Sequence, residues 1–230
     1  MHRSIVRTMT LRFRPIGAGP DLSLDAPRLI IAAYTGRNAA AVAAHIEELA
    51  AIGIPPPASV PAFFELDPAL VTSDPMVGII GSNTSGEVEP VLIRHNRRHY
   101  LGVGSDHTDR DLERADIAAS KAACPKPVGH HVVALPDDLA ALNWDGIDVE
   151  SDVDGQPYQR DNLAAMRTPT DLLAHVTSTL GELGDDLVIF CGTVPLLTGE
   201  FRPGRRWRLQ LKLDANTSLT HSYEVLPDHG

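Results

Sequence analysis

The sequence predicts a strand-rich α+β fold with a few peripheral helices. Most apolar segments are short, and they either alternate with polar residues or form continuous runs, both of which are typical of strands. Only three segments space their apolar residues as a helix does. The strands and helices also do not alternate regularly, as they would in a doubly wound parallel sheet.

The chain length limits how many domains to expect. The chain has 230 residues, of which 43% are hydrophobic and 22% charged, ordinary values for a globular protein with a sizeable core. Its length fits one large domain or two small ones. We expect residues 1–27 to be an N-terminal strand extension and residues 28–230 to form a single domain.

The first part of the chain contains two strands, one helix and one extended segment. Residues 7–14 alternate between polar and apolar side chains, and residues 28–34 form an apolar run, so both ranges predict strands. The alanine-rich residues 39–53 have helical apolar spacing, with Gly53 placed to end the helix. Residues 54–64 are rich in proline, which lacks an amide hydrogen, so we expect an extended surface segment rather than a helix or central strand.

The middle of the chain predicts a hairpin followed by a helix. Residues 87–93 and 99–104 have strand character and are separated by the polar turn 94–98, so the two strands are expected to pair. The pattern of residues 110–123 is helical, and Pro125 ends it.

The last part of the chain returns mostly to strands. Residues 147–159 predict a hairpin that turns at Asp154–Gly155. Residues 168–183 predict a helix with Thr168 or Thr170 at its N-terminal cap. Four further ranges predict strands: 130–135, 186–193, 206–214 and 218–225.

The net charge indicates which binding partners to expect, and the cysteine content indicates the cellular compartment. The formal net charge is −10 and the pI is near 5.4, which argues against nucleic acid or an anionic membrane as the main partner. No segment has the apolar length of a membrane span or of a signal peptide. Cys124 and Cys191 lack the spacing of a disulfide framework, so we expect reduced, buried thiols in a cytoplasmic protein.

Two acidic residues stand one residue apart in the segment "SGEVEP". In a strand, Glu87 and Glu89 point to the same face, an arrangement that like charges normally avoid. A cation would stabilise this pair, and Asp106, at the end of the neighbouring strand, is a candidate third ligand. Three carboxylates with water in the remaining positions suit Mg²⁺, Mn²⁺ or Ca²⁺.

The same acids have simpler interpretations. For an isolated Glu-x-Glu pair, a solvated strand face is the more common case. Asp106, Asp109 and Asp111 alternatively form a turn and helix-start cluster, where aspartate is favoured by the helix dipole. From these residues alone, both interpretations stay open.

Several segments, taken together and in order, resemble the fumarylacetoacetate hydrolase family. "GEVEPVLI" and "GVGSDHTDRDLE" resemble its Glu-x-Glu strand and its Gly-x-Asp-x-Ser/Thr-x-Arg-Asp block. "ASKAACPKPVG" is similar to its lysine followed by Cys-Pro, and "VDGQPYQRDNLAAM" to its Gln-x-x-Asn-x-x-x-Met segment. "DLVIFCGTVP" and "FRPGRRWRLQL" resemble its Gly-Thr-Pro loop and the strand that follows. Upstream, "YTGRN", "HIEEL" and "PPPASVPAFF" are similar to its Gly-x-Asn, His-x-x-Glu and proline-rich elements, so the resemblance runs from about residue 28 to the C-terminus.

This resemblance implies a mixed β-roll or β-sandwich around the active site, a homodimer, and a Mg²⁺ or Mn²⁺ ion, with Ca²⁺ as a further option. It implies three groups of site residues, namely Glu87, Glu89 and Asp106 as metal ligands, Lys121, Gln159 and Thr193 as substrate contacts, and His45 with Glu48 as a pair on a mobile segment that prepares water. Arg37 in "YTGRN" is a further substrate-binding candidate.

The expected function is a divalent-metal-dependent hydrolase that cleaves a carbon–carbon bond in a 2-oxo acid or 1,3-dicarbonyl substrate, such as an acylpyruvate, through a metal-bound enolate. In this mechanism His45 is the base that activates water, Glu48 orients it, and Lys121 supplies positive charge to the substrate. A decarboxylase, a hydratase or a tautomerase is an alternative, because the same ligand set would serve each reaction.

Two departures from the family pattern favour a further alternative, a non-catalytic small-molecule binding protein. Three residues are inserted between Asn38 and His45, and the loop after the strand reads "GTVPLL". A third departure, Arg205 where the family has aspartate, adds to the indication of an altered substrate or reaction. Without the resemblance, His45 is interpreted as a surface histidine and Lys121 as a solvated lysine at a helix end.

Other chemically suggestive residues have structural interpretations. We expect Arg110 and Asp111 to fix the start of a helix through an ion pair or a cap. His107 is expected to support the neighbouring acid or to be exposed, rather than to bind metal. His130 and His131 point to opposite faces of a strand, so we do not expect them to form a metal pair.

Overall fold

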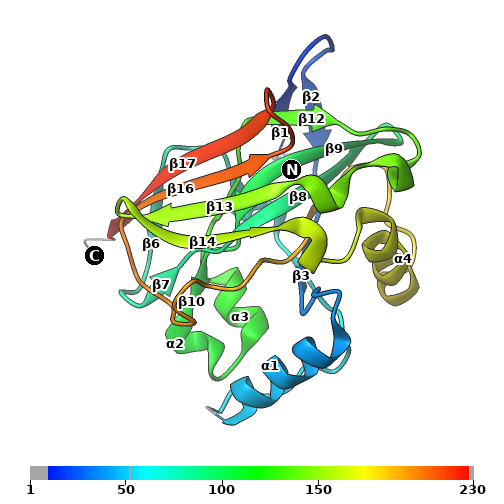
Figure 1. The fold of residues 1–230 in the computed structure, drawn as a ribbon. Coiled ribbons are helices and arrows are strands. Elements are labelled where there is room, and N and C mark those ends of the chain that lie inside the picture. Colours follow the sequence, from blue (N-terminus) through cyan, green and yellow to red (C-terminus); the bar gives the residue numbers. More distant parts are fainter. Residues whose placement is uncertain (1–9, 52, 228–230) are drawn as a thin grey trace, which may run out of the picture.

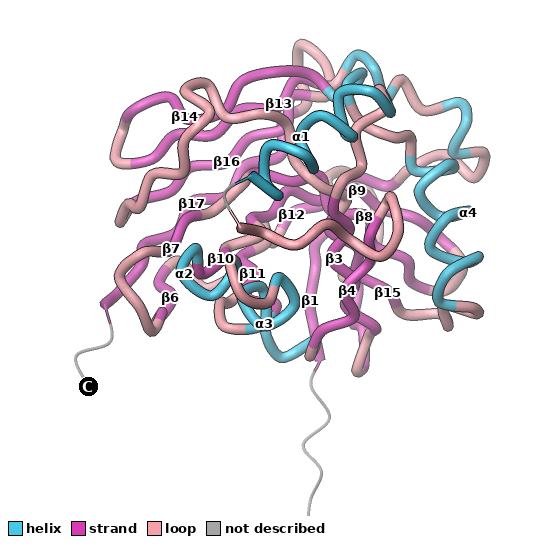
Figure 2. Tube along the Cα trace, turned by 90° about the horizontal axis from the view of Figure 1, so that it is seen from below, coloured by secondary structure: helices cyan, strands magenta, loops and turns pink. Residues whose placement is uncertain are grey.

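The structure is a computed structural model that describes residues 10–51 and 53–227. Two β-sheets pack face to face, and short helices lie at their periphery (Figures 1 and 2). The strand-rich α+β fold expected from the sequence is therefore confirmed.

The larger sheet has eight strands in the order β2-β1-β12-β9-β8-β15-β3-β4. It is mixed, since β1–β12 and β15–β3 are parallel pairs and the other neighbours are antiparallel. Its strands are β1 (Thr10–Pro15), β2 (Leu22–Asp25), β3 (Arg28–Ala33), β4 (Ala62–Leu66), β8 (Val88–His95), β9 (Arg98–Ser105), β12 (His131–Ala134) and β15 (Leu187–Phe190).

The smaller sheet has five strands in the order β14-β13-β16-β17-β6, and two short two-stranded ribbons pair β7 with β10 and β5 with β11. The five strands are β6 (Met76–Ile79), β13 (Asp148–Val153), β14 (Gln156–Asn162), β16 (Arg206–Lys212) and β17 (Ser218–Pro227). The ribbons consist of β5 (Val71–Thr72), β7 (Thr84–Ser85), β10 (Thr108–Asp109) and β11 (Lys126–Pro127).

The helices are short and surround the sheets (Figure 1). The α-helices are α1 (Ala39–Ala51), α2 (Arg110–Glu113), α3 (Ile117–Ala122) and α4 (Pro169–Leu180). The 3₁₀ helices are η1 (Pro68–Leu70), η2 (Leu139–Ala141), η3 (Trp144–Gly146) and η4 (Leu163–Ala165). Within residues 10–51 and 53–227, every helix is too short or too polar to cross a membrane.

The core lies between the two sheets and continues on the far side of the larger one. The alternating residues Trp207, Leu209 and Leu211 of β16 are buried, as the sequence pattern predicts, and they belong to one cluster with Val88 and Leu101 of the larger sheet. On the same side of that sheet, next to this cluster, α4 adds buried apolar residues to those of β3, β8 and β15. The far side of the larger sheet carries a separate buried cluster, formed mainly by β1, β2, β3, β8, β12 and β15. This packing leaves strands β8 and β9 in the middle of the molecule, where they carry the acidic residues.

Most of the expected elements are present where the sequence predicts them. The strand expected over residues 28–34 is β3, and the helix expected over residues 39–53 is α1, with Gly53 at a φ of +92°. The hairpin of β13 and β14 turns at Asp154–Gly155, both with positive φ. Thr168 caps α4 by accepting a hydrogen bond from the amide of Asp171.

Four expectations need correction or completion. The helix expected over residues 110–123 is two helices, because Asp116 caps the start of α3 and ends the preceding turn. The turn between β8 and β9 is only Asn96–Arg97, both with positive φ. The proline-rich segment 54–64 ends in the edge strand β4, and the sequence pattern did not indicate β2 or β6. The strand expected over residues 7–14 is present from Thr10 onward, and residues 7–9 lie outside the described residues.

Candidate active site

The three predicted metal ligands lie at the open end of the β8–β9 hairpin. Glu89 pairs with Gly104 across the hairpin, and the amide of Asp106 donates a hydrogen bond to the carbonyl oxygen of Glu87 at 3.1 Å. Residues opposite one another in an antiparallel pair point to the same face, as do residues two apart on one strand. The side chains of Glu87, Glu89 and Asp106 therefore share one face of the larger sheet.

Glu89 is a buried acid next to other acids. Its Oε2 accepts a hydrogen bond from the amide of Gly192 at 2.8 Å. Burial raises the pKa of Glu89 well above its ordinary value, and the negative charge of Asp106 raises it further. Nearby positive charge is what stabilises the ionised form of such a group.

Asp106 is fully buried between two lysines. The ammonium group of Lys121 hydrogen-bonds Oδ2 of Asp106, and that of Lys126 lies 3.2 Å from Oδ1. Burial alone would raise the pKa of Asp106, but the two ammonium groups outweigh burial and lower it to about 2. Burial also acts against the charge of Lys121, yet Asp106 and the two glutamates outweigh it and raise the pKa of Lys121.

Lys126 is held by the backbone of the segment around it. Its ammonium donates hydrogen bonds to the carbonyl oxygens of His107 at 2.6 Å, of Cys124 at 3.1 Å, and of Lys121. The side chain is completely buried, and burial lowers its pKa. Lys126 is a site residue that the sequence did not indicate. Its partners are mainly backbone carbonyl oxygens, which no sequence pattern indicates, so its role becomes visible only in the structure.

Arg110 holds the third acid. Its Nη2 donates to Oε2 of Glu87 at 3.0 Å, its Nη1 donates to Glu113 at 2.9 Å, and its Nε donates to Oγ of Ser85 at 2.7 Å. The ring of Phe201 covers the guanidinium at 3.5 Å. The ion pair expected of Arg110 is therefore present, whereas the cap of α2 is Asp109 rather than Arg110 or Asp111.

The side chain of Gln159 connects several backbone segments next to the acids. Its Oε1 accepts hydrogen bonds from the amide of Val88 at 2.9 Å and from Ser151 at 3.0 Å. Its Nε2 donates to Oγ1 of Thr193 at 2.7 Å and to the carbonyl oxygen of Val194 at 2.8 Å. Both amide hydrogens and both acceptor positions of Gln159 are used in this arrangement, which fixes the position of Thr193. The substrate contact expected of Gln159 stays a prediction.

Thr193 lies beside the acid cluster, as part of the loop that follows β15. Its hydroxyl donates to the carbonyl oxygen of Val88 at 2.7 Å, and the preceding Gly192 bonds Glu89. Gly192 has a φ of +93°, and a Cβ at this position would meet Oγ1 of Thr35 at 1.9 Å. The loop therefore requires glycine here to bring its amide to Glu89.

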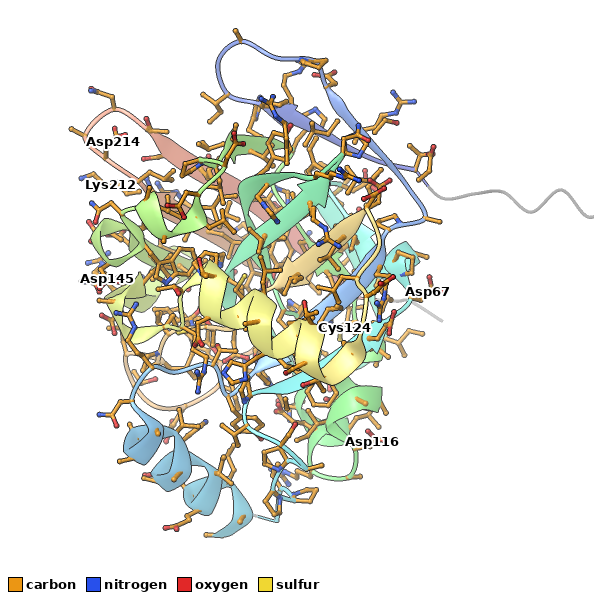
Figure 3. The ribbon with its side chains drawn as sticks, turned by 90° about the vertical axis from the view of Figure 1, so that its right-hand side faces the viewer. Asp67, Asp116, Cys124, Asp145, Lys212 and Asp214 are labelled. Carbon is orange, nitrogen blue, oxygen red and sulfur yellow. The ribbon has the colours of Figure 1, made fainter. Side chains whose placement is uncertain are left out.

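The structure does not bring His45 and Glu48 to the acid cluster. Both residues lie on α1, in which no described residue is buried, and 60% of the His45 side chain is exposed. Nδ1 of His45 is 3.7 Å from Oε2 of Glu48, a loose contact one turn apart on the helix surface. In Figures 1 and 3, α1 lies at the lower edge of the molecule, away from the body of the sheets.

Arg37 is committed to a different contact. Its guanidinium forms a two-pronged ion pair with Asp145 at 2.7 and 2.9 Å and donates to the carbonyl oxygen of Met166 at 3.1 Å. This arrangement ties the start of α1 to the 3₁₀ helices η3 and η4. Arg37 is an anchor in this structure, and the substrate-binding role expected of it stays a prediction.

His107 is buried, and both its ring nitrogens have partners. Nδ1 lies 2.9 Å from the hydroxyl of Tyr223 and Nε2 lies 3.0 Å from Oγ1 of Thr84. Burial lowers the pKa of His107 to about 3, so the ring is neutral. The supporting role expected of His107 agrees with this geometry, and a role as metal ligand does not.

The donor set has the chemistry of a divalent-cation site, although the carboxylates are held apart from one another. Within residues 10–51 and 53–227, no three His, Cys, Asp or Glu side chains are grouped closely enough to hold a metal as they stand. However, Oδ1 of Asp106 is buried and makes no well-oriented hydrogen bond, even though Lys126 is near. Carboxylate oxygens are the ligands that Mg²⁺ and Mn²⁺ prefer. The residues therefore fit such an ion in charge and ligand type, and their role as ligands stays a prediction.

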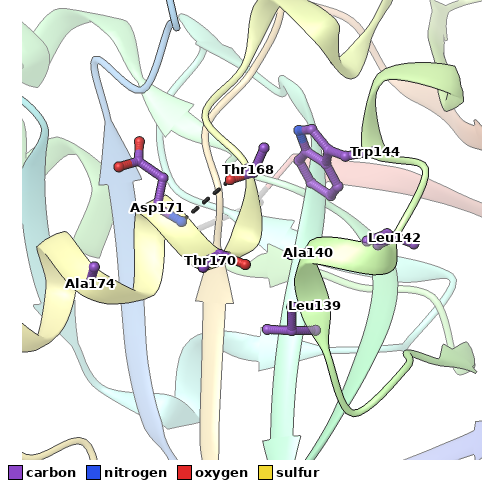
Figure 4. Close-up of a pocket in the computed structure, with 8 residues that line it drawn as sticks. All are labelled: Leu139, Ala140, Leu142, Trp144, Thr168, Thr170, Asp171 and Ala174. Atoms are coloured by element: carbon purple, nitrogen blue, oxygen red, sulfur yellow. Dashed lines mark hydrogen bonds between the residues drawn. The ribbon is translucent and has the colours of Figure 1, made fainter.

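A cavity lies elsewhere, between η2, η3 and α4 (Figure 4). It has a volume of about 470 Å³ and is lined mainly by apolar residues together with Thr168, Thr170 and Asp171. None of the predicted site residues lines it. The convergence of buried charges, and not the size of the cavity, therefore locates the candidate site at the β8–β9 hairpin.

Comparison with known proteins gives one family and one fold. Residues 32–223 match the family model described as "Protein of unknown function (DUF2848)". A search of curated proteins with the sequence finds no match.

Among solved structures, fumarylpyruvate hydrolase from Pseudomonas aeruginosa, in complex with Mn²⁺ and pyruvate, is similar with a TM-score of 0.67 and 18% identity, over 98% of this chain and 99% of that one. A putative fumarylacetoacetate isomerase/hydrolase from Oleispira antarctica is similar with a TM-score of 0.63 and 21% identity, over 88% and 94% of the two chains. A third similar structure is 5-carboxymethyl-2-hydroxymuconate delta-isomerase from Mycobacterium smegmatis. Its TM-score is 0.61 and its sequence identity 16%, over 93% of this chain and 87% of that one. At these identities the likeness establishes the fold, and it confirms the fold that the family resemblance implied.

Proposed function

We propose that this chain, which belongs to the DUF2848 family of proteins of unknown function, is a divalent-metal-dependent enzyme acting on a 2-oxo acid or 1,3-dicarbonyl compound. The observation that carries this proposal is the placement of Glu87, Glu89 and Asp106 on one sheet face. The shared fold adds support, because fumarylpyruvate hydrolase is similar over nearly its whole length and was solved with Mn²⁺ and pyruvate.

In this proposal the three carboxylates hold a Mg²⁺ or Mn²⁺ ion. When bound, the ion would act as a Lewis acid that receives two substrate oxygens and stabilises the negative charge developing as a substrate bond breaks. Around it, Arg110 fixes the position of Glu87, and the amide of Gly192 fixes that of Glu89. Lys126 fixes the backbone on both sides of the site through the carbonyl oxygens of His107 and Lys121.

The reaction we favour is hydrolysis of a carbon–carbon bond in an acylpyruvate-like substrate. Lys121 is the only buried ammonium of the described residues that lies beside Asp106 without backbone carbonyl partners, so it is the group best placed to stabilise a substrate carboxylate or oxyanion. Water activation would fall to His45, oriented by Glu48. This step requires α1 to approach the acids, and the absence of buried described residues in α1 favours such a movement.

A tautomerase or decarboxylase is the second candidate function, and a specific observation favours it. His45 is largely exposed, and Glu48 is its ionic partner. A reaction that only moves a proton or loses CO₂ beside the metal does not need an activated water. Such a reaction can therefore proceed with the acids and Lys121 while α1 stays where it is.

A non-catalytic binding protein is the less favoured alternative. The altered loop "GTVPLL" and the insertion before His45 are the two features that favour it. The loop nevertheless keeps its contacts with the site, because Gly192 bonds Glu89 and Thr193 bonds the backbone of Val88. The departure in loop sequence therefore does not remove the loop from the acid cluster.

A turnover screen tests the proposal. The purified chain is assayed with acylpyruvates, oxaloacetate and related oxo acids in the presence of Mg²⁺ or Mn²⁺. We expect metal-dependent turnover of at least one compound and its loss in Glu89→Gln, while Glu47→Gln on the exposed face of α1 keeps it. Full activity of Glu89→Gln would contradict the three-carboxylate site.

His45→Gln separates the two candidate reactions in the same screen. For a hydrolase we expect a loss of turnover of roughly 10²–10⁴-fold, as is typical when a general base is removed. For a tautomerase or decarboxylase the rate stays within a few-fold of the wild type. The homodimer remains a separate proposal, which light scattering of the purified chain tests.

A further inference from the structure

The two lysines beside Asp106 are bound in different ways. The three hydrogens of the Lys126 ammonium have a complete set of partners, three backbone carbonyl oxygens, and Oδ1 of Asp106 lies 3.2 Å away. In the described part of the chain, the one hydrogen bond of the Lys121 ammonium is to Oδ2 of Asp106. One lysine is therefore built into the backbone, whereas the other is attached to the acid alone.

Lys121 has a fixed backbone and a side chain with rotatable bonds. Its carbonyl oxygen is held by Lys126, so its main chain at the end of α3 is fixed. Its ammonium stands on a four-carbon chain with rotatable bonds, and 7% of the side chain is exposed. The side chain, and not the backbone, is therefore the part of Lys121 that would move if the ammonium turned away from Asp106.

The positive charge of Lys121 interacts electrostatically with all three carboxylates. Its pKa is raised by Asp106, with which it is in contact, and by the more distant Glu87 and Glu89. These are the same three groups that the proposed function assigns to the metal ion. A divalent cation bound by them and an ammonium on Oδ2 of Asp106 would carry like charges within a few ångströms of each other.

We propose that Lys121 and the divalent cation compete for Oδ2 of Asp106, so that loading of the cation releases Lys121 and makes its ammonium available to an anionic substrate. This inference rests on the proposed function, because it requires the cation to bind at these acids. Its consequence is an order of events, since the anionic substrate gains its lysine partner only after the cation is in place. By linkage, the presence of such a substrate partner for Lys121 strengthens cation binding by the same factor.

The first test measures Mn²⁺ affinity by calorimetry on the full chain. Lys121→Met removes the competing charge, so we expect it to bind Mn²⁺ at least roughly tenfold more tightly than the wild type. Lys121→Arg keeps a positive charge beside Asp106 and is expected to bind no more tightly than the wild type. The control is Lys212→Met, which removes the remaining lysine, an exposed one on β16 (Figure 3), and should leave the affinity unchanged.

A second titration measures oxalate affinity, for which the expected effect of Lys121→Met is opposite to its effect on Mn²⁺ affinity. Oxalate, as a small dianion, is added to each variant saturated with Mn²⁺. We expect Lys121→Met to bind oxalate at least several-fold more weakly than the wild type, because the released ammonium is missing. A lysine that only supported the fold would weaken both Mn²⁺ and oxalate binding together.

A third measurement uses the wild type, so it does not depend on a variant that folds. Reductive methylation followed by peptide mass spectrometry reports the accessibility of each of the three lysines. We expect Mn²⁺ to increase modification of Lys121 and to leave Lys126 unmodified, with Lys212 modified in both conditions.

The outcomes separate the inference from the proposed function. If the wild type binds Mn²⁺ but Lys121→Met binds it equally or more weakly, or if Mn²⁺ does not increase modification of Lys121, the competition is refuted and the metal site stands. If neither protein binds Mn²⁺, the proposed function fails, and the competition fails with it.

Discussion

The acid cluster and helix α1 are two parts of one proposed active site, yet the acids are buried and fixed by hydrogen bonds, whereas α1 lies exposed on the surface. The acids Glu87, Glu89 and Asp106 stand on paired strands in the middle of the molecule, each fixed by a specific donor. By contrast, α1 carries His45 on its exposed surface, and none of its described residues is buried. A cation site depends on fixed geometry and buried charge, which a sheet supplies, whereas a group that acts only during part of a reaction can stand on a loosely packed helix.

The largest effect on stability is expected for Asp106→Asn. This change leaves two buried ammonium groups without their carboxylate, so we expect the free energy of unfolding to fall by about 3–5 kcal/mol, as is typical when one member of a buried ion pair is removed. Urea denaturation measures it. The matched control is Glu47→Gln on α1, for which we expect a change within about 0.5 kcal/mol. If both changes lowered the free energy of unfolding equally, the acid cluster would be no more firmly held than the surface of α1.

The next largest effect is expected for Gly192→Ala in the loop that binds Glu89. The new Cβ would meet Oγ1 of Thr35 at 1.9 Å, and the residue has a φ of +93°. Together, strain and overpacking should lower the free energy of unfolding by about 2–4 kcal/mol. Gly53→Ala, at the end of α1, has a similar φ of +92° but open space around it, so about 1 kcal/mol is expected there. Thermal denaturation measures the loss of stability in each variant. Because the two glycines have nearly the same φ, the difference between the variants reports the steric clash at Gly192.

The pH dependence of stability reports how strongly the sheets bury ionisable groups. Burial lowers the pKa of His221 on β17 to about 4 in the folded state. Between this value and the ordinary value of about 6.5, the unfolded chain binds a proton that the folded chain does not, so stability falls as the pH falls. From pH 6.5 to pH 5 this amounts to about 2 kcal/mol.

His221→Phe should remove this contribution and flatten the curve of unfolding free energy against pH in that range. Urea denaturation at several pH values gives the two curves. If they run parallel between pH 5 and pH 6.5, His221 is not the group responsible.

The smallest effect on stability is expected for His45→Gln. The ring is largely exposed, and its contact with Glu48 is a loose surface pair, so the free energy of unfolding should change by less than about 0.5 kcal/mol. Any loss of turnover in this variant then reports chemistry and not folding. A destabilisation of 2 kcal/mol or more would show that α1 is packed as firmly as the acid cluster.

The parts of the site that the sequence predicted are those set by local geometry. Strand alternation places Glu87 and Glu89 on one face, and the short turn at Asn96–Arg97 fixes the register that brings Asp106 alongside them. The hairpin at Asp154–Gly155 and the cap at Thr168 were predictable for the same reason, because each depends on residues next to one another in the chain.

The parts that the sequence missed depend on distant partners. Arg37 is an anchor because of Asp145, which lies 108 positions away, and Gln159 is saturated by Val88, Ser151 and the loop at Thr193. Lys126 binds backbone carbonyl oxygens, which leave no trace in the sequence. The helical pattern over residues 110–123 is interrupted between α2 and α3 because Asp116 adopts an extended conformation and its side chain caps the start of α3.

Calorimetric titration of the wild-type chain with Mn²⁺, with and without oxalate, tests the central claim most directly. We expect one Mn²⁺ per chain and oxalate binding only when Mn²⁺ is present, because the three carboxylates hold the ion and the ion holds the anion. Oxalate binding of equal strength without Mn²⁺, or no Mn²⁺ binding at all, would contradict the claim that these acids form a divalent-cation site.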